Sequence, residues 1–126
     1  MKKRLRILCA DDNRLLGDVL VALFTKAGHV VEFFQNGGLA WERLRGDLGH
    51  FDVVVTDQQM PGLTGLELVE RLHTSKYRGR IVVHCSVVTP EQHERYHALG
   101  TAAIVLKSSR AEPLLAAVEG AAADKR

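Results

Sequence analysis

Short apolar runs and longer amphipathic runs alternate along the whole chain. The apolar runs lack the polar–apolar alternation of a half-exposed strand, so they are typical of strands that are buried on both faces. We expect strands over residues 5–10, 30–34, 52–57, 80–86 and 102–107. The amphipathic runs repeat apolar residues at helical spacing, and we expect helices over residues 13–27, 39–48, 65–75, 89–100 and 112–123. This strict alternation predicts an α/β fold, a doubly wound five-stranded parallel sheet with helices on both faces.

Length and composition narrow the class of protein. The 126 residues suit one domain, 1–126, in which the Ala-rich residues 121–126 form a tail or the start of a linker. A formal charge of +2 is too small to argue for direct nucleic-acid binding, and no apolar stretch approaches the roughly 20 residues of a membrane helix. Cys9 and Cys85 lie far apart in apolar runs, so we expect two reduced core thiols in a cytoplasmic protein.

Polar side chains follow four of the five expected strands. The first strand is followed by Asp11 and Asp12, the third ends in Asp57, the fourth in Ser86 and the fifth in Lys107. The stretch VVVTDQQMPG is notable because a strand with no polar alternation runs straight into a carboxylate. The carboxyl ends of parallel strands meet at one edge of the sheet, where ligands bind. We therefore expect a site there that contains three carboxylates, a hydroxyl and an ammonium group.

This set of side chains suits a hard cation and a phosphoryl group. Three clustered carboxylates repel each other unless a cation or raised pKa values relieve them. Magnesium prefers oxygen ligands, takes one or two carboxylates and completes its shell with water and phosphate oxygens. Lys107 and Ser86 can donate to phosphate oxygens. A carboxylate beside a metal ion and an ammonium group can also act as a nucleophile and form an aspartyl phosphate.

The order of these residues resembles one known family. The acidic pair after the first strand is followed by the pattern D-x-x-M-P-G-x-x-G from Asp57 to Gly65. A hydroxyl residue then ends the fourth strand and a lysine ends the fifth. Together these features resemble the receiver domain of two-component response regulators, of the chemotaxis-regulator type, and the resemblance covers the whole chain. It implies a flavodoxin-like sheet with strand order 2-1-3-4-5.

The resemblance also implies roles for individual residues. Asp57 would be the phosphoacceptor and would receive a phosphoryl group from a sensor histidine kinase or a phosphotransfer protein. Magnesium or manganese would be held by Asp12, Asp57 and the backbone carbonyl of Gln59. Asp11 would act on the metal ion mainly through water.

By the same resemblance, Ser86 and Lys107 would form the switch and would contact the phosphoryl oxygens. The domain would signal by binding a downstream protein that the sequence does not identify. It would not be an enzyme, apart from its own magnesium-dependent phosphorylation and dephosphorylation. We expect no direct nucleic-acid binding and no membrane association.

Three residues depart from the family pattern, all on the side that normally reads out phosphorylation. Val87 stands where the family usually has a small residue, Ile104 replaces a tyrosine or phenylalanine, and Ser108 replaces a proline that usually follows a cis peptide bond. Without proline a cis bond costs about 2.5–4 kcal/mol, so the bond before Ser108 is expected to be trans, or strained if cis. We expect phosphoryl transfer to remain and the conformational response to weaken. The alternative is a pseudo-receiver, an interaction module that no longer uses phosphorylation.

Other features allow different interpretations. The run HERYH, 93–97, matches the zinc motif H-E-x-x-H, but we favour a solvated helix face with Tyr96 and Leu99 turned inward. His84 lies inside a strand, and we expect a hydrogen-bonded core histidine. A flavin-binding protein of similar topology would need a phosphate loop rich in serine, threonine and glycine after the first strand, where this chain has acidic residues.

Overall fold

The structure is a computed structural model that describes residues 3–123, and within them strands and helices alternate strictly. The strands are β1 (Arg6–Ala10), β2 (Val30–Phe34), β3 (Val53–Thr56), β4 (Arg80–Cys85) and β5 (Ala103–Leu106). The helices are α1 (Arg14–Lys26), α2 (Gly37–Gly46), α3 (Gly65–Thr74), α4 (Pro90–Ala98) and α5 (Glu112–Ala123). The sheet has the order β2-β1-β3-β4-β5 and all neighbouring strands are parallel. This confirms the predicted doubly wound fold and its strand order.

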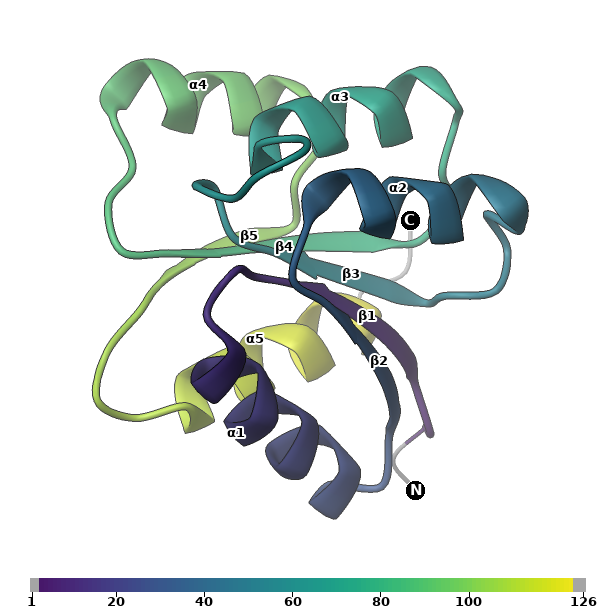
Figure 1. Ribbon diagram of the computed structural model, residues 1–126, viewed down its shortest axis with the longest axis vertical. Helices are drawn as coiled ribbons and strands as arrows, with labels where there is room; N and C mark the ends of the chain where they lie inside the picture. The colour runs from purple at the N-terminus through teal and green to yellow at the C-terminus, as the bar shows by residue number, and fades with distance from the viewer. Residues whose placement is uncertain (1–2, 124–126) are drawn as a thin grey trace.

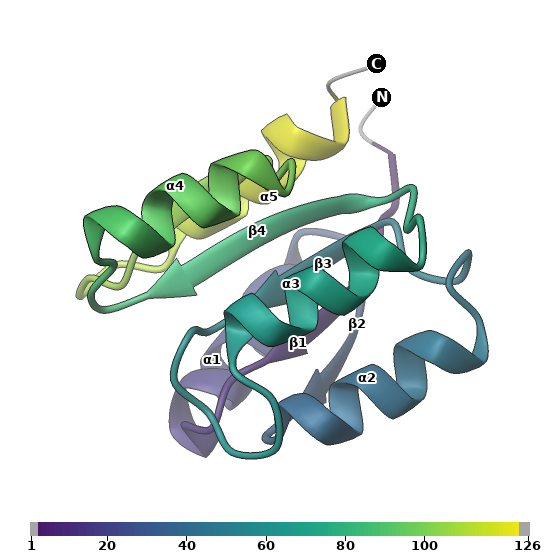
Figure 2. The same cartoon turned by 90° about the horizontal axis from the view of Figure 1, so that it is seen from above.

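Two layers of helices cover the sheet. Helices α1 and α5 lie on one face and α2, α3 and α4 on the other (Figure 1), where Figure 2 shows the three helices in front of the strands. The central strand β3 is buried throughout: Val54 packs into the core beneath α2, α3 and α4, and Val53 and Val55 into the core beneath α1 and α5. Burying a side chain of this size stabilises the fold by roughly 1.5–3 kcal/mol, so β3 joins both halves of the core.

Helix α2 begins two residues before the start expected from its apolar spacing. Asn36 caps it, because its side-chain oxygen accepts hydrogen bonds from the backbone N–H groups of Gly38, at 2.7 Å, and Leu39, at 3.2 Å. Gly37 fits as the first helical residue because a Cβ there would lie 2.0 Å from the carbonyl oxygen of Leu63. The spacing of apolar residues did not reveal this start, because Gly37 and Gly38 carry no apolar side chain. The Asn36 cap and the close approach of Gly37 to the Leu63 carbonyl set the boundary instead.

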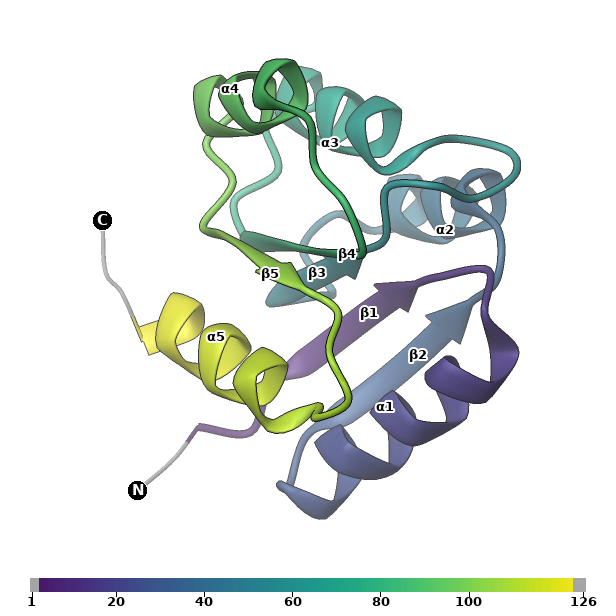
Figure 3. The same cartoon turned by 90° about the vertical axis from the view of Figure 1, so that its left-hand side faces the viewer.

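Backbone hydrogen bonds extend the strand ladder as far as the residues expected at the site. The N–H groups of Asp11, Asp57 and Lys107 donate to carbonyl oxygens of neighbouring strands at 3.0, 2.9 and 2.8 Å, respectively. Because the strands are parallel, as Figure 3 shows, their carboxyl ends lie at one edge of the sheet. The fold therefore fixes the backbone of three site residues at that edge.

The remaining expectations on organisation concern the cysteines and the end of the chain. Cys9 and Cys85 are buried and unpaired, and they belong to the cores on opposite faces of the sheet. Residues 121–123 complete α5, and residues 124–126 of the expected tail lie outside the described part of the chain. None of the described helices is long and apolar enough to cross a membrane.

Three helices end in the same six-residue turn, in which an N–H group bonds to the carbonyl five residues before it. The pairs are His29 to Phe24, Tyr77 to Leu72 and Thr101 to Tyr96, at 3.0, 2.9 and 3.1 Å. This turn needs a left-handed residue, for which glycine is favoured. Gly28 and Gly100 fill the position after α1 and α4, but Lys76, with φ of 60°, fills it after α3. The end of α3 therefore carries backbone strain that the other two helix ends avoid.

We expect Lys76→Gly to stabilise the protein by about 0.5–1 kcal/mol, because glycine adopts the left-handed conformation without the Cβ penalty while losing more entropy on folding. Urea unfolding monitored by circular dichroism measures this difference. Ser75→Gly is the matched control: Ser75 has φ of −83°, so glycine there should destabilise. Equal effects of the two substitutions would contradict the strain at Lys76.

Candidate functional site

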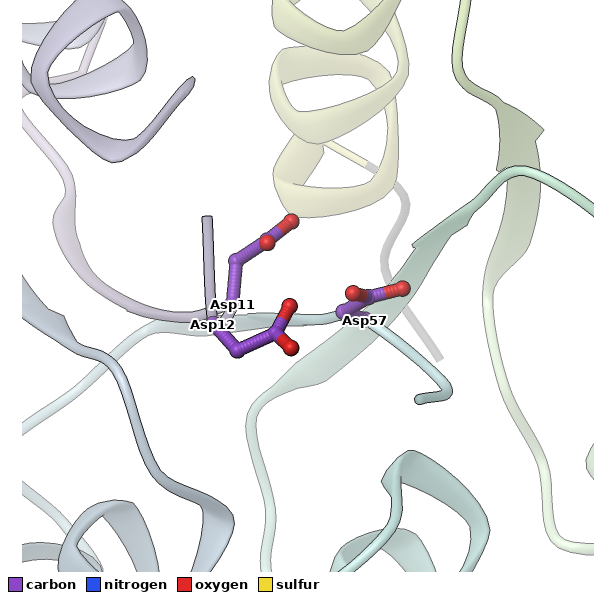
Figure 4. Close-up of side chains that lie close together, drawn as sticks. All are labelled: Asp11, Asp12 and Asp57. Carbon is purple, nitrogen blue, oxygen red and sulfur yellow. The ribbon is translucent and has the colours of Figure 1, made fainter. Parts of the chain in front are cut away.

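Three carboxylate groups lie together at the carboxyl edge of the sheet. Asp11 and Asp12 follow β1, Asp57 follows β3, and one oxygen from each lies within 4.8 Å of the others. Figure 4 shows Asp11 and Asp12 leaving the same stretch of chain in different directions, with the Asp12 carboxylate directed toward Asp57. Asp11 and Asp57 are buried and Asp12 is exposed. The predicted acidic cluster is therefore assembled, with one of its members open to solvent.

The start of α1 leaves both acidic residues that follow β1 free of the capping role. Asn13 is the N-cap, and its side-chain oxygen accepts from the N–H of Leu16 at 3.1 Å. Asp11 instead accepts from the N–H of Asn13 at 2.9 Å, which orients its carboxylate. Asp12 therefore caps no helix, and its side chain is exposed.

Lys107 brings a positive charge to two of these carboxylates. Its Nζ atom lies 2.8 Å from Asp11 Oδ2 and 3.1 Å from Asp57 Oδ2. The other oxygen of Asp57, Oδ1, accepts a hydrogen bond from the N–H of Gln58 at 2.8 Å. Both oxygens of Asp57 thus have a fixed donor, and the carboxylate is held in one orientation.

The acidic residues and the lysine shift each other's proton affinity. Burial, and then the nearby charge of Asp11, raise the pKa of Asp57, and the hydrogen bond and charge of Lys107 oppose this without cancelling it. For Lys107, burial disfavours the ammonium form, but hydrogen bonds and charge from Asp11 and Asp57 outweigh it and raise its pKa. The site therefore holds a firmly protonated lysine beside a carboxylate whose negative charge is only partly compensated.

An open cavity of about 430 Å³ joins this cluster to the other predicted site residues. Its lining includes Asp57 and Lys107 together with Ser86, Gln59 and Val87. Ser86 and Gln59 are exposed, and Val87 has 74% of its surface exposed. The structure thus brings the expected acceptor, switch hydroxyl and lysine to one cavity, with Val87 among its walls.

The two departures on and after β5 have defined positions. Ile104 is half-buried and packs against the core beneath α2, α3 and α4, where it presents no hydroxyl group. No peptide bond in the described part of the chain is cis, so the bond between Lys107 and Ser108 is trans, as expected without proline. The side chain of Lys107 therefore reaches the carboxylates from a loop whose peptide bonds are all trans.

Gln58 is a residue of this site that the sequence did not single out. It is buried, its side-chain oxygen accepts from the N–H of Leu66 at 3.1 Å, and it also accepts from the hydroxyl of Tyr96. Its carbonyl oxygen accepts from the N–H of Gly65 at 2.9 Å. The only available signal was its place directly after Asp57, because glutamine is usually a surface residue.

The alternative zinc site is not assembled. His93 and His97 are exposed on α4, and the group of Asp11, Asp12 and Asp57 is the one cluster of three potential metal ligands among residues 3–123. Tyr96 and Leu99 are buried. The prediction of a solvated face with these two residues turned inward is therefore confirmed.

The prediction of a hydrogen-bonded core histidine at position 84 was wrong in one respect. His84 is buried, but its Nδ1 atom has no hydrogen-bond partner among the described residues. Burial and then the positive charge of Lys107 lower its pKa to about 4, so the imidazole is neutral at neutral pH. A neutral ring can be buried among apolar side chains at less cost than a charged one, although its free nitrogen remains unpaired.

Curated relatives and solved structures resemble this chain over most of its length. A gliding motility regulatory protein of Myxococcus xanthus is 33% identical over 116 residues, which cover 90% of this chain and 15% of that protein. The response regulator receiver protein CpdR of Brucella abortus is 41% identical over 66 residues, which cover 52% of this chain and 53% of that protein. The chain thus spans only part of these relatives.

The solved structures show the same fold. The non-phosphorylated HemR receiver domain of Leptospira biflexa has a TM-score of 0.87 at 23% identity, with 98% of each chain covered. The chemotaxis response regulator CheY4 of Vibrio cholerae has a TM-score of 0.84 at 23% identity, with 94% of this chain and 99% of that one covered. A family model described as the response regulator receiver domain matches residues 7–119. This chain therefore belongs to the response regulator receiver domain family.

Proposed function

We propose that Asp57 is the phosphoacceptor of a signalling domain that receives its phosphoryl group from the phosphohistidine of a sensor histidine kinase or a phosphotransfer protein. The observation that carries the proposal is the Asp57 carboxylate itself. It lies at an open cavity, held by Lys107 and Gln58, beside two further carboxylates. Receiver domains are signalling domains and are generally not enzymes, so the phosphorylated form would act by binding other proteins.

In the transfer step, a carboxylate oxygen of Asp57 would attack phosphorus, forming an oxygen–phosphorus bond as the phosphorus–nitrogen bond to the histidine breaks. The electron pair of that bond would leave with the imidazole of the partner. Lys107 would move from the Asp57 carboxylate to a phosphoryl oxygen, where its charge stabilises the transferred group. Ser86, exposed at the same cavity, would donate its hydroxyl hydrogen to another phosphoryl oxygen.

The acidic cluster fits a magnesium ion. Its three carboxylates supply hard oxygen ligands within 4.8 Å of one another, and Asp12 is exposed to the cavity, where water and phosphate oxygens can complete an octahedral shell. Asp12, Asp57 and the backbone carbonyl of Gln59 would bind the ion, and Asp11 would act through water. Manganese would suit the same ligands. When bound, the ion neutralises charge on the transferring phosphoryl group.

We expect incubation with acetyl phosphate and magnesium to add one phosphoryl group, detected as a single adduct by intact mass spectrometry. Asp57→Asn and a sample with a chelator should both lack the adduct, because each removes a component of the transfer. Asp18→Asn, an exposed residue of α1, is the matched control and should be labelled as fully as the parent. No adduct on the parent, under conditions that label another receiver domain, would favour the pseudo-receiver alternative raised by Val87 and Ile104.

We also expect Asp57→Asn to stabilise the metal-free protein at neutral pH. The native pKa of Asp57 is raised, so the folded state binds this proton more tightly than the unfolded state. The folded state therefore loses stability as pH rises from the ordinary carboxyl pKa through the raised one. The advantage of the asparagine variant should grow over this window and then level off.

Urea unfolding over a pH series with a chelator present measures this difference in unfolding free energy. Asp18→Asn should differ from the parent by no more than about 0.5 kcal/mol across the series. Adding magnesium should stabilise the parent and not Asp57→Asn, because the ion would relieve the repulsion between carboxylates. A pH-independent gain from Asp57→Asn would show that Asp57 is not strained by its charged neighbours.

A further inference from the structure

One buried residue links the Asp57 carboxylate to two helices. The backbone N–H of Gln58 donates to Asp57 Oδ1 at 2.8 Å, and its carbonyl accepts from the N–H of Gly65, at the start of α3, at 2.9 Å. The side-chain oxygen of Gln58 accepts from the N–H of Leu66 and from the hydroxyl of Tyr96, on α4. Gln58 thus has hydrogen bonds to the proposed acceptor, to α3 and to α4 at once.

The packing around this link leaves little room for independent movement. Tyr96 is fully buried, and its hydroxyl is so close to the start of α3 that a Cβ on Gly65 would lie 2.9 Å from it. The same Cβ would lie 2.1 Å from the carbonyl oxygen of Asp57. Protein interiors packed this tightly transmit a displacement to their neighbours instead of absorbing it.

The hydroxyl group beside Gln58 comes from α4 and not from β5. Ile104 packs in the same core as Tyr96, and its side chain has neither a donor nor an acceptor. Among residues 3–123, the other side chains of α4 that form hydrogen bonds or ion pairs do so with Thr89 or Glu70, at the surface. Among the described residues, the hydrogen bond from the Tyr96 hydroxyl to Gln58 is therefore the polar contact that joins α4 to the loop between β3 and α3.

We propose that Gln58 and Tyr96 carry the phosphorylation state of Asp57 to helix α4. This inference rests on the proposed function. Phosphorylation turns the charged carboxylate into an acyl phosphate, so the N–H of Gln58 loses a charge-assisted acceptor and finds a weaker one or a phosphoryl oxygen. The resulting shift of Gln58 changes the hydrogen bond that its side chain accepts from Tyr96. The two states of Asp57 therefore favour different positions of α4, and a partner bound to α4 favours one state of Asp57 in return.

The test compares three proteins: the parent, Tyr96→Phe and Tyr77→Phe. Each is given magnesium and beryllium fluoride, which imitates a phosphoryl group on the carboxylate, and the change in amide chemical shifts is followed by NMR. Tyr77→Phe is the matched control because it also removes one hydroxyl hydrogen bond, to the carbonyl of Phe51 at 2.9 Å, from a side chain packed on the same core. In Tyr96→Phe we expect the amides of Asp57 and Lys107 to shift as in the parent. The shifts within α4 should fall to about half of the parent's or less, because the hydrogen bond that couples α4 to Gln58 is missing. Tyr77→Phe should match the parent throughout.

Unchanged α4 shifts in Tyr96→Phe would overturn the inference, as would an equal loss in Tyr77→Phe, which would indicate a general loosening of the core. A response at Asp57 without any response in α4 of the parent would overturn it while leaving the proposed function intact. No response at Asp57 in the parent would contradict the proposed function and the inference with it. If Tyr96→Phe does not fold, Gln58→Met removes the same acceptor with a side chain of similar length and should reduce the α4 shifts in the same way.

Discussion

The rest of the site depends on the ion pairs between the ammonium group of Lys107 and the carboxylates of Asp11 and Asp57. Lys107 follows the edge strand β5, and its side chain passes the end of β4 to lie 2.8 Å from Asp11, after β1, and 3.1 Å from Asp57, after β3. This one side chain therefore connects the loop after the edge strand with the ends of the two strands β1 and β3. Without it, two buried carboxylates would face each other with no counter-charge, which would destabilise the fold.

The stability of the sheet makes this charged arrangement possible. Val53, Val54 and Val55 are buried on both faces of the central strand, and the backbone ladder continues through the N–H of Asp57. The charge therefore appears only where the strand has left the apolar core and reached a cavity open to water. A carboxylate in that position is held in one orientation, only partly neutralised and part of the wall of an open cavity, which are properties that a nucleophile or a metal ligand needs.

The proposed acceptor residues and the proposed response residues differ in how closely they follow the family. Asp12, Asp57, Ser86 and Lys107 line one cavity, and Asp11 contacts Lys107 beside it. Ile104, in contrast, leaves β5 without the aromatic group that the resemblance leads one to expect. In this chain the buried aromatic hydroxyl beside the acceptor segment belongs to Tyr96. Under the proposed link through Gln58, helix α4 and not β5 is the element that responds to Asp57.

Much of the fold and the acidic site was predictable because both follow from local patterns. The spacing of apolar residues located β2 and α5 at their observed bounds, and parallel topology places Asp11, Asp57 and Lys107 at one edge whatever their side-chain conformations. The spacing of apolar residues did not show that α2 starts at Gly37. The Asn36 cap and the close approach of Gly37 to the backbone of Leu63 decide this boundary.

The sequence by itself determined the elements, their order and the residues at the strand ends, because periodicity and turn residues act over a few positions. Only the tertiary structure decided the contacts between distant segments. Tyr96 meets Gln58 across 38 residues, and His29 meets Glu119, at 2.8 Å, across 90. The tertiary structure also left the Nδ1 atom of His84 without a hydrogen-bond partner among residues 3–123. Such contacts depend on how helices pack over the sheet, and that packing is set jointly by many side chains with no single signal in the sequence.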